Sequence, residues 1–233
     1  MSSNVDGAWE APFFFVPNEE PAYHLEEVPL PRMMANWREV LLDAVSPLES
    51  GVRGLQVSGY RPIGGGQLRP RRTAAVLVPV LDLAEPEMVF TRRAEHLPQH
   101  PGQVSFPGGA AEQQDESAVQ TALREAYEEI GLPPEVTRPI GFLDRMDTIS
   151  DYRVLPVVAL VTPPVHWVLD SREVAEVFSV PLCVVLDKDR YERHQIDRDG
   201  IEHTIWSLSW NGYNIWGVTA AILMNLILRI QSF

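Results

Sequence analysis

The segment Ala118–Ile130 constrains the fold most, because complete helix start and stop signals bound it. Ser117 can cap the first turn, and Gln120 stands three residues later at the capping-box position. Gly131 provides the stop at the other end. An apolar stripe at helical spacing predicts the face that meets the core, and it consists of Val119, Leu123, Ala126 and Ile130.

Three glutamates of this helix share a second face, since Glu125, Glu128 and Glu129 stand at i, i+3 and i+4. Like charges at this spacing repel each other by about a few tenths of a kcal/mol per pair. Taken alone, such a group is typical of a solvated acidic face. A divalent cation, Mg²⁺ or Mn²⁺, would instead remove the repulsion, because both ions prefer carboxylate and phosphate oxygens.

The residues around the helix favour the metal over the solvated face. Gly108 and Gly109 lie in a loop, Pro107 to Gly109, where the backbone can pass close to a ligand because glycine has no side chain. Arg124 adjoins the glutamates and could orient one of them through a charge-assisted hydrogen bond. The combination indicates a site for a metal ion and a phosphate group, with Gly108 and Gly109 as candidate substrate-binding residues.

The chain divides into an N-terminal extension, residues 1–70, and a main domain, residues 71–233. The extension contains one short helix, expected over 37–45, and could cap the domain, form a homodimer contact or remain mobile. From Thr73 onward β-rich runs interleave with helices, which predicts an α/β or α+β domain with helices packed on a sheet. A hairpin is expected over 194–210 with its turn at Asp199-Gly200, and a last helix over 217–231.

The net charge of −13 limits the classes of partner. Nucleic acids and membrane surfaces attract cationic proteins, so neither is expected to bind this chain broadly. A small polyanionic substrate would need local positive charge, from metal ions or a few arginines. The apolar run 215–230 is shorter than the roughly 20 residues of a membrane span and is expected to be a buried helix.

The single cysteine, Cys183, excludes an intramolecular disulfide and fits a reducing, cytoplasmic location. Its apolar neighbours predict a small buried side chain. The first ten residues are acidic and have no apolar core, so they are not expected to form a secretory signal.

The glycine loop and the acidic helix together resemble the box of the Nudix hydrolases, G, five residues, E, seven residues, then REUxEExGU with U aliphatic. Residues Arg124 to Leu132 match its second half completely. Its first half departs from the pattern, because Ala110 stands at the glycine position when Glu116 is taken as the first glutamate. Counting forward from Gly109 reaches Asp115 instead, so the loop is one residue longer than usual.

The Nudix resemblance implies an α/β/α sandwich with a mixed sheet, and metal-dependent hydrolysis of a diphosphate bond. It also implies Mg²⁺ or Mn²⁺ on Glu125 and Glu129, with Glu128 as a further ligand or a helper of the base. Water would then attack one phosphorus in line, and catalysis would rest mostly on positioning and charge stabilisation.

The segment from Thr91 to Gly109 is similar to the signature of the coenzyme A (CoA) pyrophosphatase branch. Arg93 matches that signature, as do Thr91, Ala94, Gly102 and 106–109, whereas Pro98 stands where the pattern has an arginine. This likeness implies that CoA is split into 3′,5′-ADP and 4′-phosphopantetheine. Arg92 and Arg93 could meet the phosphate charge, and Arg92 or His100 could substitute for the missing arginine.

Two glutamates outside the helix, Glu173 and Glu176, are candidate general bases from a loop that could fold over the site. The ordinary alternative is that they belong to a polar surface loop without a catalytic role. His96 and His100 flank the glycine loop, where structural hydrogen bonding is the more usual role. Four late aromatic residues are expected in the core or an interface, and stacking of one of them on a nucleobase is the less usual alternative: Trp206, Trp210, Tyr213 and Trp216. A Nudix hydrolase of ADP-ribose or dinucleotides, and a non-catalytic nucleotide sensor, remain alternatives to the CoA enzyme.

Overall fold

A computed structural model of the protein describes residues 29–48, 57–59, 72–148, 152–198 and 201–231. Its helices are α1 (Leu30–Ala35), α2 (Trp37–Ala44), α3 (Ala118–Ile130), α4 (Leu182–Val185) and α5 (Gly217–Ile230). Its strands are β1 (Val57–Gly59), β2 (Arg72–Leu81), β3 (Glu87–Arg93), β4 (Val104–Ser105), β5 (Gly108–Ala110), β6 (Thr137–Phe142), β7 (Arg145–Asp147), β8 (Tyr152–Val161), β9 (Val174–Pro181), β10 (Tyr191–Arg198), β11 (Ile201–Trp210) and β12 (Tyr213–Trp216).

A mixed sheet forms the centre of the molecule. Strands β2 and β8 pair in parallel over their whole length, whereas β3, β5 and β6 join them as antiparallel neighbours. The two central strands are almost continuously apolar, as expected for strands that are covered on both faces. The second sheet, β10-β11-β12, is antiparallel and leads into α5.

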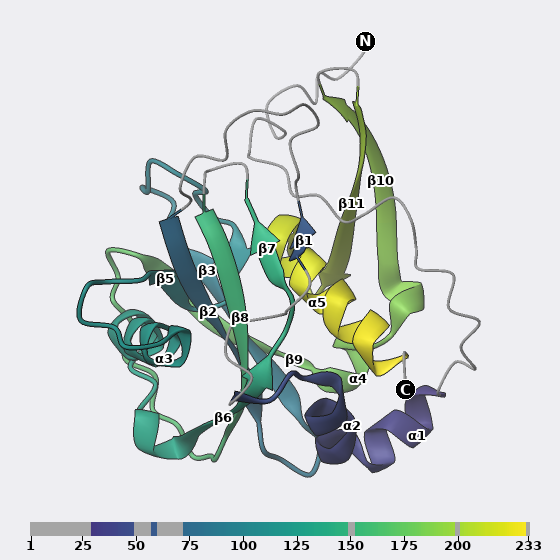
Figure 1. Ribbon diagram of the computed structural model, residues 1–233, viewed down its shortest axis with the longest axis horizontal. Helices are drawn as coiled ribbons and strands as arrows, with labels where there is room; N and C mark the ends of the chain where they lie inside the picture. The colour runs from purple at the N-terminus through teal and green to yellow at the C-terminus, as the bar shows by residue number, and fades with distance from the viewer. Residues whose placement is uncertain (1–28, 49–56, 60–71, 149–151, 199–200, 232–233) are drawn as a thin grey trace.

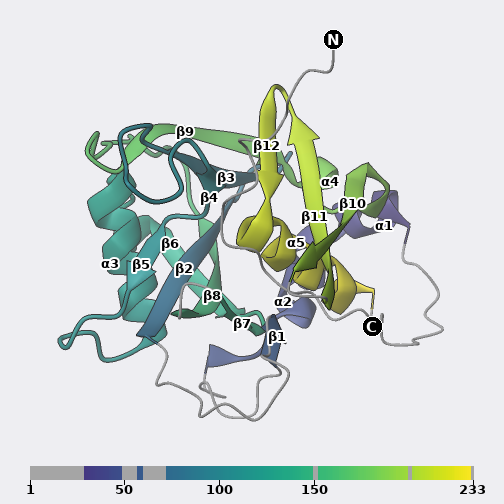
Figure 2. The same cartoon turned by 90° about the horizontal axis from the view of Figure 1, so that it is seen from above.

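Helices cover both faces of the mixed sheet, with α3 on one side and α2 and α5 on the other (Figures 1 and 2). Alternate residues of β2 explain the two layers, because Ala75 and Leu77 pack with α3 while Val78 and Val80 pack with α5. The predicted α/β fold, an α/β/α sandwich with a mixed sheet, is therefore confirmed.

Helix α2 joins the N-terminal part of the chain to this core. Trp37, Leu41 and Ala44 are buried with residues of α5. The expected helix over 37–45 is confirmed to within one residue, whereas α1 was not predicted. The proposed domain boundary near residue 70 falls in 60–71, outside the described residues.

A polar network fixes the same junction. Arg229 of α5 contacts the Asp144 carboxylate at 2.8 Å, the Ser46 hydroxyl at 2.9 Å and the carbonyl of Ala44. Asn225 exchanges two hydrogen bonds with Asp144, at 3.1 and 2.8 Å. The C-terminal helix thereby holds the end of α2 against the sheet.

Replacing Arg229 by methionine is expected to lower the free energy of unfolding by about 2 kcal/mol, because a mostly buried ion pair is broken. The side chains of Arg229 and Asp144 are only 23% and 11% exposed. Urea denaturation measures the loss. The control is Arg190→Met, which removes a more exposed pair with Asp187 and should cost less than about 1 kcal/mol; equal losses would contradict the assignment.

Three smaller expectations have different outcomes. The hairpin over 194–210 is confirmed by the pairing of β10 with β11, although its turn at Asp199-Gly200 lies outside the described residues. Cys183 is exposed, so the prediction of a buried thiol is wrong. Helix α4 buries Leu182, Val184 and Val185 and leaves Cys183 on its exposed side. Among the described residues, no helix is long and apolar enough to cross a membrane.

Candidate active site

Helix α3 begins and ends where its capping signals predict. The Ser117 hydroxyl accepts a hydrogen bond from the backbone N–H of Gln120 at 3.2 Å. The Gln120 side chain accepts from the backbone N–H of Glu116 at 2.7 Å, one residue before the usual capping-box partner. Gly131 ends the helix in the left-handed conformation, with φ of 66°. The helix therefore holds its glutamates in a fixed register.

The three glutamates of α3 differ in burial, although Arg124 contacts both Glu125 and Glu128. Glu129 is buried and accepts a hydrogen bond from the backbone N–H of Gly108 at 3.1 Å. The side chain of Glu125 is 16% exposed, and that of Glu128 is 57% exposed. Glu125 and Glu129 thus turn toward β5, whereas Glu128 faces outward.

The two glycines of β5 let the strand pass close to Glu125 and to the neighbouring strand. A Cβ added to Gly109 would lie 2.5 Å from the carboxyl carbon of Glu125. A Cβ on Gly108 would lie 2.6 Å from the Cα of Val76 on the neighbouring strand. The predicted substrate-binding glycines are therefore also the residues that let α3 bring Glu125 and Glu129 against the sheet.

Asp115 anchors Arg124. The sequence left open whether Asp115 or Glu116 takes the position of the first glutamate of the Nudix box. The Asp115 side chain is 1% exposed and accepts hydrogen bonds from Arg124 at 3.1 and 3.0 Å, from Thr121 at 3.0 Å and from the Glu112 backbone at 2.9 Å. The Arg124 guanidinium holds the pKa of this carboxyl well below its usual range. Glu116 has only its backbone in the capping bond.

Arg124, held by Asp115, also binds glutamates of α3. It donates to Glu125 at 2.9 Å, to Glu128 at 3.2 Å and to the carbonyl of Ala110 at 3.1 Å. The longer glycine loop thus places an aspartate where the resemblance would expect the first glutamate. The signal was present in the sequence, because Asp115 is the residue reached by counting from Gly109.

Asp115→Asn is expected to lower the free energy of unfolding by about 2 kcal/mol and turnover by about tenfold, because Arg124 loses charge-assisted hydrogen bonds and orients Glu125 less firmly. Because residues of its own loop cover Asp115 near the surface, we expect a loss of free energy of unfolding at the lower end of that for buried ion pairs. Denaturation and initial rates measure the two effects. Glu116→Gln is the matched control, and a larger effect there than at Asp115 would reverse the assignment.

Burial is the largest influence on the pKa values of Glu129 and Glu125. Burial raises the pKa of Glu129 to about 8, and the charges of Glu125 and Glu173 raise it further against the Gly108 hydrogen bond. Burial also raises the pKa of Glu125, although Arg124 opposes the shift. Two carboxylates that share a desolvated site are a suitable donor set for a divalent cation.

The site offers two carboxylate ligands for a metal ion rather than a complete coordination shell. In the described part of the chain, no three Asp, Glu, His or Cys side chains already surround one point. Mg²⁺ is commonly held by one or two carboxylates together with water and substrate phosphate. Glu125 and Glu129 fit that arrangement, with Glu128 within reach of the same arginine.

Metal affinity is expected to increase as the pH rises toward 8, with release of a proton, because Glu129 must ionise to bind the ion. Without metal, the folded chain keeps a proton that the unfolded chain loses above about pH 4.5, so the free energy of unfolding should fall between pH 4.5 and 8. Calorimetry in buffers of different ionisation enthalpy measures the proton, and pH-independent affinity would contradict the shift.

The two candidate bases occupy different surroundings. The charge of Glu173 contributes to the raised pKa of both Glu125 and Glu129, so it lies near the carboxylate pair. Glu176 instead accepts hydrogen bonds from the Tyr213 hydroxyl at 2.6 Å and from Arg92 at 3.2 Å. Both hydrogen bonds lower the pKa of Glu176, and the bond from Tyr213 has the larger effect. The structure therefore brings only Glu173 into the electrostatic field of the site.

The loop before β9 positions Glu173 relative to α3. The backbone N–H of Asp170 donates to the carbonyl of Glu129 at 2.9 Å, and that of Val168 donates to Ile130 at 3.0 Å. The carbonyl of Asp170 in turn accepts from the backbone N–H of Glu173 at 2.9 Å. One residue therefore links the backbone of Glu129 to that of Glu173.

Arg92 and Arg93 have different surroundings, and the pairing of β3 with β9 shifts register between them. Arg92 is engaged by Glu176 and, at 2.9 Å, by Glu95. Arg93 lines a cavity and influences both Glu129 and His100 electrostatically. Its buried Nε has no hydrogen-bond partner among the described residues. Arg93 is thus the better placed of the two to meet an anionic substrate.

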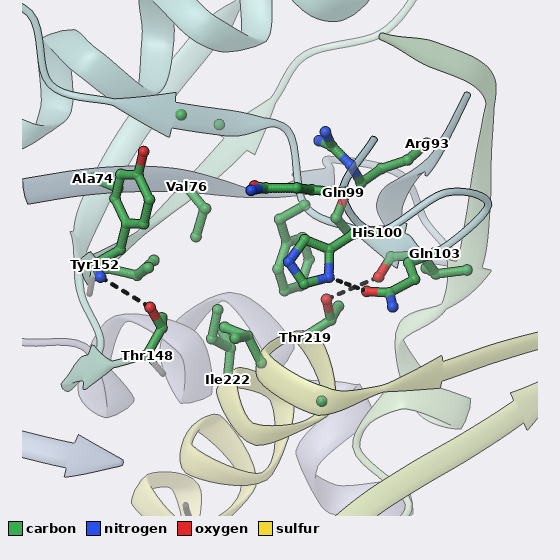
Figure 3. Close-up of a pocket in the computed structure, with 18 of the residues that line it drawn as sticks. Ala74, Val76, Arg93, Gln99, His100, Gln103, Thr148, Tyr152, Thr219 and Ile222 are labelled. Atoms are coloured by element: carbon green, nitrogen blue, oxygen red, sulfur yellow. Dashed lines mark hydrogen bonds between the residues drawn. The ribbon is translucent and has the colours of Figure 1, made fainter. Parts of the chain in front are cut away.

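The cavity has a volume of about 320 Å³ and lies between the sheet and the start of α5 (Figure 3). Its walls come from β2, β5 and β8, from the loop that carries His100, and from Trp216 to Thr219. Gly108 and Gly109 are shared by this cavity and by the carboxylate pair, so the two are adjacent. Trp206, Trp210 and Tyr213 pack against the core as predicted, whereas Trp216 lines the cavity.

Comparisons with known proteins agree with this geometry. A NUDIX domain model matches residues 70–199. An uncharacterized Nudix hydrolase NudL of Enterobacter sp. (strain 638) is 43% identical over 171 residues, covering 73% of this chain and 88% of the relative. The NudL protein of Citrobacter koseri has the same identity and coverage.

Solved structures include a NUDIX hydrolase from Alicyclobacillus acidocaldarius, with 22% identity, a TM-score of 0.42, and coverage of 67% of this chain and 91% of that one. The Nudix hydrolase RenU from M. smegmatis is 26% identical, with a TM-score of 0.41 and coverage of 48% and 71%. The domain match and the NudL relatives decide the assignment: this chain belongs to the Nudix hydrolases, metal-dependent enzymes that act on small molecules containing a nucleoside diphosphate.

Proposed function

We propose that this enzyme hydrolyses the diphosphate bond of CoA or acyl-CoA, giving 3′,5′-ADP and the corresponding 4′-phosphopantetheine. Arg93 carries this proposal. It matches the arginine position of the CoA signature, and its Nε is buried without a partner in the described residues. It also lines the cavity and acts electrostatically on Glu129. A cation held there suits a substrate with several phosphate groups.

Glu125 and Glu129 would hold Mg²⁺ or Mn²⁺, with Glu128 as a further ligand or helper. When bound, the ion neutralises the diphosphate and acidifies the attacking water. Arg124 keeps Glu125 in place through the hydrogen bonds described above. Gly108 and Gly109 leave room for the diphosphate beside the sheet.

Glu173 would serve as the general base. It accepts a proton from water while the water oxygen forms a bond to one phosphorus. The bridging P–O bond breaks, and its electron pair leaves with the other phosphate, so two monophosphates result. Glu176, although also a candidate, is assigned a supporting role because Tyr213 and Arg92 already engage it.

A substrate panel tests the proposal. Turnover of CoA, acetyl-CoA, ADP-ribose and diadenosine polyphosphates is compared with Mg²⁺ and with Mn²⁺, and products are identified by mass. CoA or acetyl-CoA should have the highest kcat/KM. Far faster turnover of ADP-ribose or a dinucleotide would overturn the CoA assignment, and binding without turnover of any substrate would favour a nucleotide sensor.

A further inference from the structure

The cavity beside the carboxylate pair is large enough for one part of a substrate only. Its volume of about 320 Å³ is at the lower end of the roughly 300–1,000 Å³ typical of ligand cavities. Its walls include apolar side chains of the sheet and of α5, among them Val76, Val154 and Ile222. Such a space suits a compact group with apolar faces that is joined to the diphosphate by a short link.

Several polar groups that line this cavity already have partners within the protein. The Thr219 hydroxyl donates to the carbonyl of Val104 at 3.0 Å. The Ser105 hydroxyl is paired with that of Thr91 at 2.9 Å. A flat heterocycle needs few polar partners, whereas an extended arm with repeated amides needs many. The lining therefore favours a nucleobase over the pantetheine arm.

His100 offers this group a hydrogen-bond acceptor. Its Nδ1 lies 3.0 Å from Oε1 of Gln103, and because an amide oxygen only accepts, Nδ1 must donate. Burial lowers the pKa of His100, so the ring is neutral near pH 7 and its Nε2 carries a lone pair. Nε2 has no hydrogen bond to another described residue, and Figure 3 shows this edge of the ring directed away from Gln103 into the cavity.

The backbone holds the ring in this position at a conformational cost. His100 has a φ of 55°, in the left-handed region that non-glycine residues seldom adopt. The backbone N–H of Gln103 donates to its carbonyl at 3.4 Å, and Gly102 follows with a φ of 67°. Strain of this kind persists where surrounding contacts impose it and is frequent at ligand sites.

We infer that the cavity takes the nucleobase of the substrate, and that His100 selects a base with an exocyclic amino group, adenine rather than hypoxanthine. The inference rests on the proposed function, because it requires a nucleotide substrate. The amino group of adenine would donate to Nε2 of His100. Hypoxanthine presents an oxygen at that position, which places two acceptors face to face.

Binding of the product nucleotide tests the inference without hydrolysis. Calorimetry with Mg²⁺ compares 3′,5′-ADP with its hypoxanthine counterpart on the full chain. The wild-type protein should bind the adenine nucleotide about tenfold more tightly. His100→Gly, which tolerates the left-handed backbone, should remove this preference, whereas His96→Gly, at an exposed position of the same loop, should retain it.

A second variant guards against a folding defect. His100→Asn also tolerates the backbone conformation, but its side chain is too short to reach the same point, so it should lose the preference as well. An unchanged preference in both His100 variants would overturn the inference. So would a loss of affinity for 4′-phosphopantetheine instead of the nucleotide. A base preference that depends on His100 in a protein that fails to hydrolyse CoA would support the inference and refute the CoA assignment.

Discussion

Glu129→Gln is expected to lower kcat by about a thousandfold or more, because the substitution removes a buried carboxylate that neutral glutamine cannot replace as a metal ligand. The amide oxygen can still accept the hydrogen bond from Gly108. The side-chain volume is also unchanged. Without metal, the variant should unfold at the same or a higher denaturant concentration at pH 7, since it avoids the free-energy cost of burying a carboxyl group that is ionised in the unfolded chain.

Initial rates at saturating Mg²⁺ or Mn²⁺, together with metal titration, measure this effect. Glu128→Gln is the matched control on the same helix. Its carboxylate is mostly exposed, so the loss should be at least tenfold smaller than at Glu129. Unchanged turnover in Glu129→Gln would refute the metal assignment, and an equal loss in both variants would restore the three-glutamate cluster expected from helical spacing.

Glu173→Gln is expected to reduce kcat by about a hundredfold with little change in KM, because general-base catalysis contributes roughly 10²–10⁴-fold. Its side chain is exposed, so the free energy of unfolding should change by less than about 0.5 kcal/mol. The acidic limb of the pH–rate profile should also change shape, since the proton acceptor is gone.

Glu176→Gln tests whether Glu176 acts as a general base or stabilises the fold. Glu176 joins β9 to β3 through Arg92 and to β12 through Tyr213, whose ring stacks on Phe178 at 3.7 Å. We expect this variant to lose stability more than turnover. If Glu176→Gln loses the acidic limb and Glu173→Gln keeps it, the two roles are reversed.

Local signals in the sequence were sufficient for the helix and its chemistry. Ser117 and Gly131 bound α3 because capping depends on groups within one turn of the helix end. The Nudix resemblance of Arg124 to Leu132 gave the family, since the spacing of the glutamates along one helix is itself a local property. Alternating β-rich and helical runs predicted helices packed on a sheet, and the Nudix resemblance implied that the sheet is mixed.

Other roles depended on contacts between distant segments. Helical spacing placed three glutamates on one face, but the close approach of β5 turned Glu125 and Glu129 inward and left Glu128 exposed. Asp115 and Glu116 are neighbours of equal charge, and only the loop geometry assigned Arg124 to Asp115. Similarly, Glu173 and Glu176 are equivalent candidate bases in the sequence. Only the tertiary structure shows that Tyr213 and Arg92 bind Glu176.

The sequence alone therefore determined the family, the helix that carries the glutamates and the need for a divalent cation, because these follow from residue types at short spacing. The tertiary structure alone decided which carboxylates are desolvated, which arginine remains available and which histidine faces the cavity. Those properties depend on burial and on hydrogen-bond partners far apart in the chain. Arg93 follows the register shift in β3, His100 has a left-handed backbone, and both residues line the cavity.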